Sequence, residues 1–182
     1  MEPHQIVGIS KLLSRALRHD PRLLGLQLDA QGWADVDSLL AGVNAQGIVL
    51  SLDMLREVVD KNDKKRFSFS EDEKRIRANQ GHSIKIDLDL APVIPPEFLY
   101  HGTAKHFIAS IQRNGLIPRK RIHVHLSQDE QTAQNVGKRH GEPIVLVIRA
   151  AEMHTEGHVF YLSDNHVWLT KTVPPRFIDF PA

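Results

Sequence analysis

The chain has 182 residues, 41% of them hydrophobic, which suffices for one packed domain or two small ones. It contains no cysteine, and this excludes disulfide bonds, thiolate catalysis and cysteine-ligated metals. The eleven histidines follow no metal-binding spacing, so we expect no metal. No apolar run approaches the roughly 18 residues of a membrane-spanning helix, and the N-terminus lacks the features of a signal peptide. We therefore expect a cytoplasmic protein without a membrane partner.

Three helices are predicted in the first part of the chain. Apolar residues at three- and four-residue spacing predict a helix over residues 5–19, which Asp20 and Pro21 end. Shorter helices are expected over residues 35–43 and 51–61, the latter with Ser51 as its N-cap.

The hydrophobic period then changes from that of a helix to that of a strand. Apolar and polar residues alternate over residues 67–69 and 76–78, on either side of an acidic turn, which predicts a β-hairpin. The same alternation predicts a further strand over residues 84–88. Three helices followed by a hairpin is the order of a winged-helix unit, a helix-turn-helix variant often used on nucleic acid.

Three prolines within residues 91–96 favour a domain boundary, which we place between residues 93 and 94. In the second domain, strands such as 98–100 and 144–148 alternate with helices over 104–114 and after Ser127, which has the spacing of a capping box with Glu130. We therefore expect an α+β fold whose second domain, residues 94–182, is dominated by sheet.

Positive charge is concentrated in one stretch of the chain. Residues 61–85 contain eight Lys/Arg and four Asp/Glu, a local net charge of +4, whereas the whole chain has a net charge of only +1. Residues 1–93 carry 13 basic and 14 acidic residues, so the domain as a whole has a net charge of −1. This local concentration implies an anionic partner.

Arginine and histidine are the candidate functional side chains, because no nucleophile with a positioned base is recognisable. They occupy polar, non-periodic positions: Arg18, His19, Arg66, Arg75, Arg77, His82, His101, His125 and Arg139. Several converging arginines suit a phosphate monoester, since each guanidinium grips two phosphate oxygens. Structural roles are the alternative: cations in the last turn of a helix complement its dipole, His125 suits a strand, and Thr103 is expected to cap a helix.

Five blocks of sequence, taken in order, are more specific than these patterns. They are residues 10–19 (SKLLSRALRH) with Gly32 and Trp33, residues 62–67 (NDKKRF), 75–83 (RIRANQGHS), 100–103 (YHGT) and 123–127 (HVHLS). Together they resemble the RNA 2′-phosphotransferase family of the KptA type. The match covers nearly the whole chain, and the RANQGHS stretch is highly specific.

The resemblance implies an N-terminal winged-helix lobe that binds RNA and a C-terminal ADP-ribosyltransferase-like lobe that binds NAD. That family removes an internal 2′-phosphate from RNA, such as one left at a tRNA splice junction. The phosphate first displaces nicotinamide from NAD, giving a 2′-phospho-ADP-ribosyl intermediate. The ribose hydroxyl then releases the RNA and ADP-ribose 1″,2″-cyclic phosphate.

The resemblance also implies roles for individual residues. An essential Arg-His-Arg-Arg set, which would hold the phosphate and balance its charge, falls on Arg18, His19, Arg66 and Arg139. The residues implied for NAD binding are His101, Gly102, Thr103, His125 and Ser127. Those implied to line a cleft between the lobes are Arg77, Gln80, Gly81, His82 and Ser83.

Two other functions stay open. An ADP-ribosyltransferase acting on protein or on nucleic-acid ends would leave ADP-ribose on its acceptor, although the catalytic glutamate of many protein-modifying enzymes is not recognisable. A non-catalytic RNA-binding winged helix would bind RNA and release no nicotinamide. For the first-ranked function we expect RNA with an internal 2′-phosphate as partner, NAD as a consumed co-substrate, and a monomer.

Overall fold

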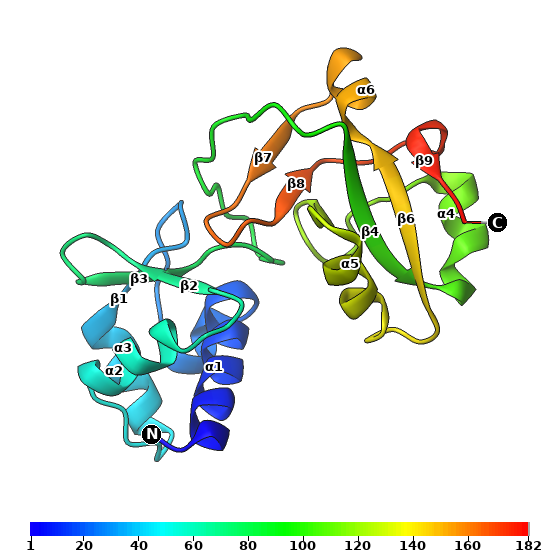
Figure 1. The fold of residues 1–182 in the computed structure, drawn as a ribbon. Coiled ribbons are helices and arrows are strands. Elements are labelled where there is room, and N and C mark those ends of the chain that lie inside the picture. Colours follow the sequence, from blue (N-terminus) through cyan, green and yellow to red (C-terminus); the bar gives the residue numbers. More distant parts are fainter. Residues whose placement is uncertain (182) are drawn as a thin grey trace. The chain divides into compact units, whose positions relative to one another are not determined.

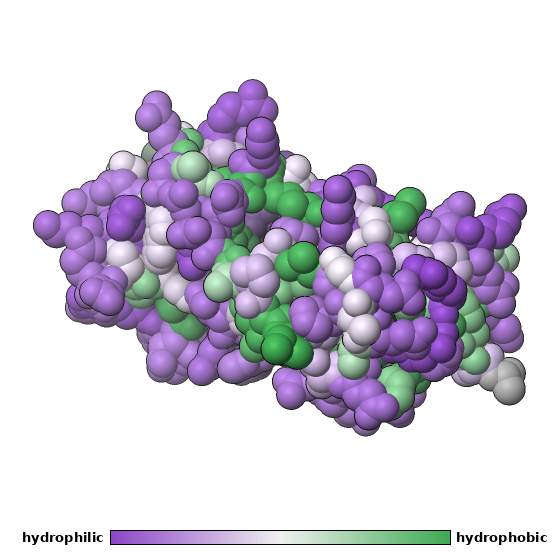
Figure 2. Space-filling model, turned by 90° about the horizontal axis from the view of Figure 1, so that it is seen from above, coloured by the Kyte–Doolittle hydropathy of each residue, from purple (hydrophilic) through white to green (hydrophobic). Residues whose placement is uncertain are grey.

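A computed structural model describes residues 1–181, which form two compact units, Met1–Asp89 and a second unit that begins at Leu90. Both units combine helices with small antiparallel sheets, so the fold is α+β, as the sequence predicted (Figure 1). Hydrophilic residues cover most of the visible surface in Figure 2. None of the helices in residues 1–181 is long and apolar enough to cross a membrane.

The first unit contains four helical segments: α1 (Pro3–Arg18), η1 (Pro21–Leu24), α2 (Val36–Ala45) and α3 (Leu52–Asp60). Asp35 accepts a hydrogen bond from the Ser38 N–H where α2 begins, and Ser51 caps α3 in the same way. α1 ends at Arg18 because Asp20 precedes a proline, which disfavours helical backbone. Arg18 and His19 therefore lie at the end of a helix.

A three-stranded antiparallel sheet completes the first unit, in the order β1 (Ala34–Asp35), β3 (Arg75–Ala78), β2 (Phe67–Phe69). This confirms the predicted hairpin. Ile76 is fully buried, and because side chains alternate along a strand, Arg75 and Arg77 lie on the opposite face.

The prediction of a strand over residues 84–88 is wrong. No strand forms there, because the segment does not lie along a partner strand. The Asp87 N–H instead donates to the carbonyl of Ala30, a loop residue, and Asp89 has a φ of 52°, which leaves the extended region.

The second unit holds two antiparallel sheets. One has the order β4 (Phe98–Ala104), β6 (Pro143–Arg149), β9 (Ile178–Asp179), and the other has the order β5 (Val124–Leu126), β8 (Trp168–Thr170), β7 (Phe160–Leu162). Two backbone hydrogen bonds between Tyr100 and Ser127 join β4 to the chain that leaves β5. The helical segments are η2 (Lys105–Phe107), α4 (Ile108–Asn114), α5 (Glu130–Gly137), α6 (Ala150–Thr155) and η3 (Pro175–Phe177).

Helix α5 packs directly on strand β4 at Gly102. A Cβ atom at this position would lie 1.6 Å from the carbonyl oxygen of Ala133 and 2.9 Å from the backbone nitrogen of Gly137. Only glycine allows two backbones to approach so closely. The neighbouring Thr103 is 5% exposed inside β4.

Two local predictions in the second unit are wrong. Thr103 does not cap a helix, because β4 continues to Ala104 and pairs with β6 along its whole length. The helix expected from residue 104 accordingly begins only at Ile108. Helix α5 is capped by Asp129, which accepts from the Thr132 N–H at 2.7 Å, and not by a capping box from Ser127.

The two units divide before the prolines that marked the expected boundary between residues 93 and 94. Pro92 pairs with Tyr161, and the Val93 N–H donates to the Phe160 carbonyl. These backbone contacts with β7 place residues from Leu90 onward in the second unit.

A matched pair of valines tests the core of the first unit. Val58 on α3 is fully buried, whereas Val49 is 78% exposed. We expect Val58→Ala to lower the free energy of unfolding by about 2 kcal/mol, because it removes buried apolar surface and leaves a cavity. Val49→Ala should change it by less than about 0.5 kcal/mol. Amide hydrogen exchange of α1 and α3 measures this unit separately, and equal effects of the two variants would contradict the assignment of the core.

Candidate functional site

A groove of about 550 Å³ on the first unit lies between α1 and the turn that follows α3. Its lining includes one acidic residue, Asp63, with His19 and six lysines or arginines: Lys11, Arg15, Arg18, Lys61, Lys64 and Arg66. The unit as a whole, residues 1–89, has 13 basic and 14 acidic residues. The cations are therefore gathered by their placement, and the groove suits an anionic ligand.

One wall of the groove is the polar face of α1. Residues Lys11, Arg15 and Arg18 recur at four- and three-residue spacing and line this wall, while Leu13 and Leu17 face the core. The amphipathic pattern that predicts the helix therefore also places these cations along one side of it.

The end of α1 is held by the segment that follows β3. The Ser83 N–H donates to the Arg18 carbonyl at 2.9 Å, and the Ser83 Oγ lies 2.8 Å from His19 Nδ1. Gly81 has a φ of +88°, and a Cβ there would lie 3.5 Å from Arg18 Nη1. The structure therefore brings Gly81 and Ser83, both expected near the site, against Arg18 and His19.

The buried Asn62 connects the two walls of the groove. It is 6% exposed and donates from Nδ2 to the Oγ of Ser10 on α1 at 2.8 Å. Its Oδ1 accepts from Arg66, from the backbone N–H at 3.4 Å and from Nη1 at 3.3 Å. One amide side chain thereby sets the place of Arg66 relative to α1.

Asn79 fixes the same turn from the side of the hairpin. Its Nδ2 donates to the Lys65 carbonyl at 2.7 Å, and its N–H donates to the Arg66 carbonyl at 2.9 Å. Lys65 itself has a φ of 39°, a left-handed conformation within this turn. Arg66 is thus held on both sides, in the same groove as Arg18 and His19.

His82 is not an exposed ligand but a buried neutral side chain. It is 2% exposed, and burial lowers its pKa to about 4, with the nearby positive charges of Arg18, His19 and Arg77 acting in the same direction. Within residues 1–181 its Nε2 has no hydrogen-bond partner. His82 therefore fills the space beside the arginines without adding a charge at neutral pH.

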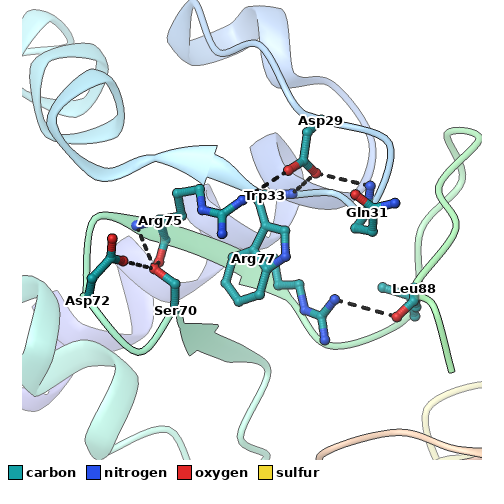
Figure 3. Close-up of polar contacts among 8 residues, drawn as sticks. All are labelled: Asp29, Gln31, Trp33, Ser70, Asp72, Arg75, Arg77 and Leu88. Atoms are coloured by element: carbon teal, nitrogen blue, oxygen red, sulfur yellow. Dashed lines mark hydrogen bonds and ion pairs between the residues drawn. The ribbon is translucent and has the colours of Figure 1, made fainter.

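Arg77 lies on the outer face of the sheet and outside the groove. Its Cζ lies 4.6 Å from the centre of the Trp33 ring and that of Arg75 lies 5.4 Å away, which is a cation–π arrangement (Figure 3). Arg77 Nη1 also donates to the Leu88 carbonyl at 3.5 Å, and Arg75 pairs with Asp29 at 3.4 Å. We call Trp33, Arg75 and Arg77 the sheet-face cluster.

Gln80 follows directly after Asn79, at the turn that leads from β3 to Gly81. Its side chain is half-buried, and within residues 1–181 its Oε1 is buried without a hydrogen-bond partner. Of the five expected cleft residues, Gly81 and Ser83 thus adjoin the groove directly, while Arg77 lies on the sheet face.

A second polar cluster lies in the second unit, where β4 meets β5. His101 Nδ1 lies 3.0 Å from the His125 carbonyl, and because a carbonyl only accepts, this nitrogen carries the proton. Burial is the main cause that lowers the pKa of His101. Gly102 and Thr103 follow on β4, and Ser127 pairs with Tyr100 by backbone hydrogen bonds.

Arg121 belongs to this cluster and was missed by the sequence analysis. Its Nη1 lies 2.7 Å from His125 Nδ1, so His125 accepts there and is protonated on Nε2, since a guanidinium only donates. Burial lowers the pKa of Arg121, and the neighbouring positive charge of Arg139 lowers it further. The basic run of residues 119–121, one residue before the HVHLS block, is the feature of the sequence that could have indicated it.

The expected site residues therefore form two sets, each within one unit. Arg18, His19 and Arg66 share the groove of the first unit. His101, His125 and Arg139 lie in the second unit, together with Arg121. Among residues 1–181 no group of three or more His, Asp or Glu side chains is arranged to hold a metal ion.

Comparison with known proteins gives a consistent result over almost the whole chain. The profile described as RNA 2′-phosphotransferase, Tpt1/KptA family, matches residues 4–172. A protein of Rhodopirellula baltica named "Probable RNA 2′-phosphotransferase" is 52% identical over 179 residues, which is 98% of this chain and 97% of that protein. Proteins of the same name from Hahella chejuensis and Pseudomonas aeruginosa are 54% and 52% identical, over 93% and 98% of this chain and 91% and 98% of their own lengths.

The pKa of His82 makes stability depend on pH. Its folded pKa of about 4 lies below the ordinary value of 6.5, so only the unfolded chain binds the proton between these pH values. The free energy of unfolding should therefore fall as the pH falls from 6.5 to 4. NMR titration should give a midpoint near 4, and His82→Gln should flatten this part of the stability curve. A midpoint above 6 would contradict the neutral, buried state.

Proposed function

Because the chain belongs to the RNA 2′-phosphotransferase family of the Tpt1/KptA type, we propose that it is a transferase that removes an internal 2′-phosphate from RNA. The arrangement of cations in the groove of the first unit supports this proposal. Arg18, His19 and Arg66 share one groove in a unit whose net charge is otherwise negative. Such a concentration of cations suits a dianionic phosphate monoester.

We assign the first unit to RNA and the second to NAD. The order of helices followed by a hairpin supports a winged-helix lobe, whose cations lie in the groove. Two small sheets packed with short helices support an ADP-ribosyltransferase-like lobe. This assignment gives each of the two reactants its own compact unit.

In the proposed reaction, the arginines of the groove hold the phosphate and balance its charge. Asn62 accepts from the Arg66 guanidinium, and the Ser83 N–H holds the backbone of Arg18 at the end of α1, so the Arg66 side chain and the Arg18 backbone are positioned before the substrate binds. His19 is a phosphate hydrogen-bond donor, oriented by the Ser83 hydroxyl. Preorganised charge of this kind lowers a barrier without an acid–base pair.

The polar cluster of the second unit suits a dinucleotide with a pyrophosphate. Arg121 and Arg139 supply positive charge, and His101, His125 and Ser127 supply hydrogen-bonding groups. Gly102 and Thr103 belong to the same stretch of β4, where Gly102 lets α5 pack against the strand. When bound, NAD would supply the ribose carbon that accepts the phosphate as nicotinamide leaves, and the 2″-hydroxyl whose attack on phosphorus would release RNA with a free 2′-hydroxyl and ADP-ribose 1″,2″-cyclic phosphate. We keep Arg139 as the fourth member of the catalytic set and add Arg121 as a second candidate for the same role.

An RNA with one labelled internal 2′-phosphate tests the function. We expect the label to leave the RNA only when NAD is supplied, in equal amounts with nicotinamide, and an RNA with a 2′-hydroxyl at the same position is the control. Retention of label with NAD present would overturn the proposal. Stable ADP-ribose on the control RNA would instead identify an ADP-ribosyltransferase.

Arg66→Ala tests the role of the groove. We expect turnover to fall by roughly 10²- to 10³-fold, as when one preorganised donor is removed from an active site. Thermal stability should change little, because Asn62 keeps its bond to Ser10. Lys74→Ala is the matched control, since it removes a cation from the same hairpin but outside the groove. Near-native turnover of Arg66→Ala would show that the groove is not the catalytic site.

A further inference from the structure

We propose that the groove continues beyond the phosphate site as a track for the RNA strand that flanks the 2′-phosphate. Lys11 and Arg15 would neutralise phosphodiesters of this strand. The proposal rests on the proposed function and extends it, because it makes the enzyme selective for a phosphate within a chain over one on a short fragment.

The length of the groove exceeds what one phosphate needs. Its α1 wall runs from Ile6 to His19, which is roughly 20 Å at 1.5 Å per residue. Arg18 and His19 occupy only the end of this wall, and Arg66 lies on the other wall of the groove. A nucleic-acid strand carries a phosphate about every 3.4 Å along the axis of a duplex, so the remaining length accommodates several nucleotides.

The exposed face of α1 carries cations without acidic neighbours. Its sixteen residues include no aspartate or glutamate, so no cation of the helix has an acidic partner three or four residues away within it. Two other cations of the unit do have acidic partners: Arg56 pairs with Glu73, and Lys61, on the other side of the groove, pairs with Glu57, both at 2.6 Å.

Lys11 and Arg15 are not compensated in this way. Both are exposed, and among residues 1–181 neither side chain makes a hydrogen bond or ion pair. Like charges four residues apart on a helix repel one another, and a polyanion lying along the groove removes this repulsion.

The far end of the groove changes from charged to apolar. Ile6 and Val7 line it there, and Val7 is 53% exposed, which offers contact to an unstacked base. Ser14 lies between the cations and supplies a hydroxyl for a phosphate oxygen. Along α1 the phosphate site is followed by the cations and then by apolar surface. This order suits an RNA strand whose backbone follows the helix.

The sheet-face cluster is the competing path for RNA, and its contacts argue against it. Arg75 is paired with Asp29 and Arg77 with the Leu88 carbonyl, and both guanidinium groups lie on Trp33 (Figure 3). Binding there would have to replace these contacts, whereas Lys11 and Arg15 are available without rearrangement.

The double variant Lys11→Gln/Arg15→Gln tests the track with two substrates, a 2′-phosphorylated dinucleotide and a 10-mer with the same central phosphate. We expect the ratio of kcat/KM for the 10-mer to that for the dinucleotide to fall roughly tenfold at low salt. The decrease should appear mainly in KM. Arg22→Gln, which removes an exposed cation outside the groove, should leave the ratio unchanged.

Binding of an unmodified 10-mer separates this proposal from the proposed function, because it needs no turnover. The slope of log affinity against log salt should decrease by about 1.4 in the double variant, as expected for two single-strand phosphate contacts. An unchanged slope, or a slope that decreases instead in Arg75→Gln, would overturn the track. Equal losses with both substrates would also overturn it, since the two cations would then serve the phosphate site itself.

Discussion

The hydrogen bonds of Asn62 are the interaction on which the groove depends. A buried amide is costly unless its donors and acceptors are satisfied, and here Ser10 on one side and Arg66 on the other satisfy them. The same side chain thus stabilises the packing of the turn on α1 and sets the distance between the two walls. Asn79 fixes the turn from the opposite side, so the position of Arg66 is determined by the fold and not by its own flexible side chain alone.

The electrostatics of the site follow from this arrangement. Positive charges brought close together repel, and the protein limits this cost in two ways. His82 stays neutral because it is buried among Arg18, His19 and Arg77, and Arg121 in the second unit donates to a neutral His125. The neutral imidazole of His82 thus lies among positively charged side chains, and the neutral imidazole of His125 accepts a hydrogen bond from a guanidinium group. A bound phosphate relieves the repulsion that remains among these cations, and this relief favours its binding.

Much of the fold was predictable because its signals are local. The periodicity of α1, the Ser51 cap of α3 and the alternation of the β2–β3 hairpin each depend on near neighbours in the chain. Predictions failed where a distant partner decides the outcome. Thr103 stays in β4 because β6 pairs with it, and residues 84–88 form no strand because no strand lies beside them. In the sequence, the groove is indicated only by a cluster of positive charges. The place of Arg66 in it depends on Asn62, and the importance of Asn62 is recognised only once Ser10 is known to lie next to it.

The contact of Gly102 with α5 has a consequence for the dynamics of the second unit. Strand β4 touches the carbonyl of Ala133 backbone to backbone, with no side chain between them that a rotamer change might shift. The strand that carries His101 and Thr103 therefore cannot slide or tilt without moving α5 and the chain that leads from it to Arg139. Any rearrangement during a reaction cycle must then occur as a displacement of these elements together, so the spacing among their polar groups is preserved while the unit moves.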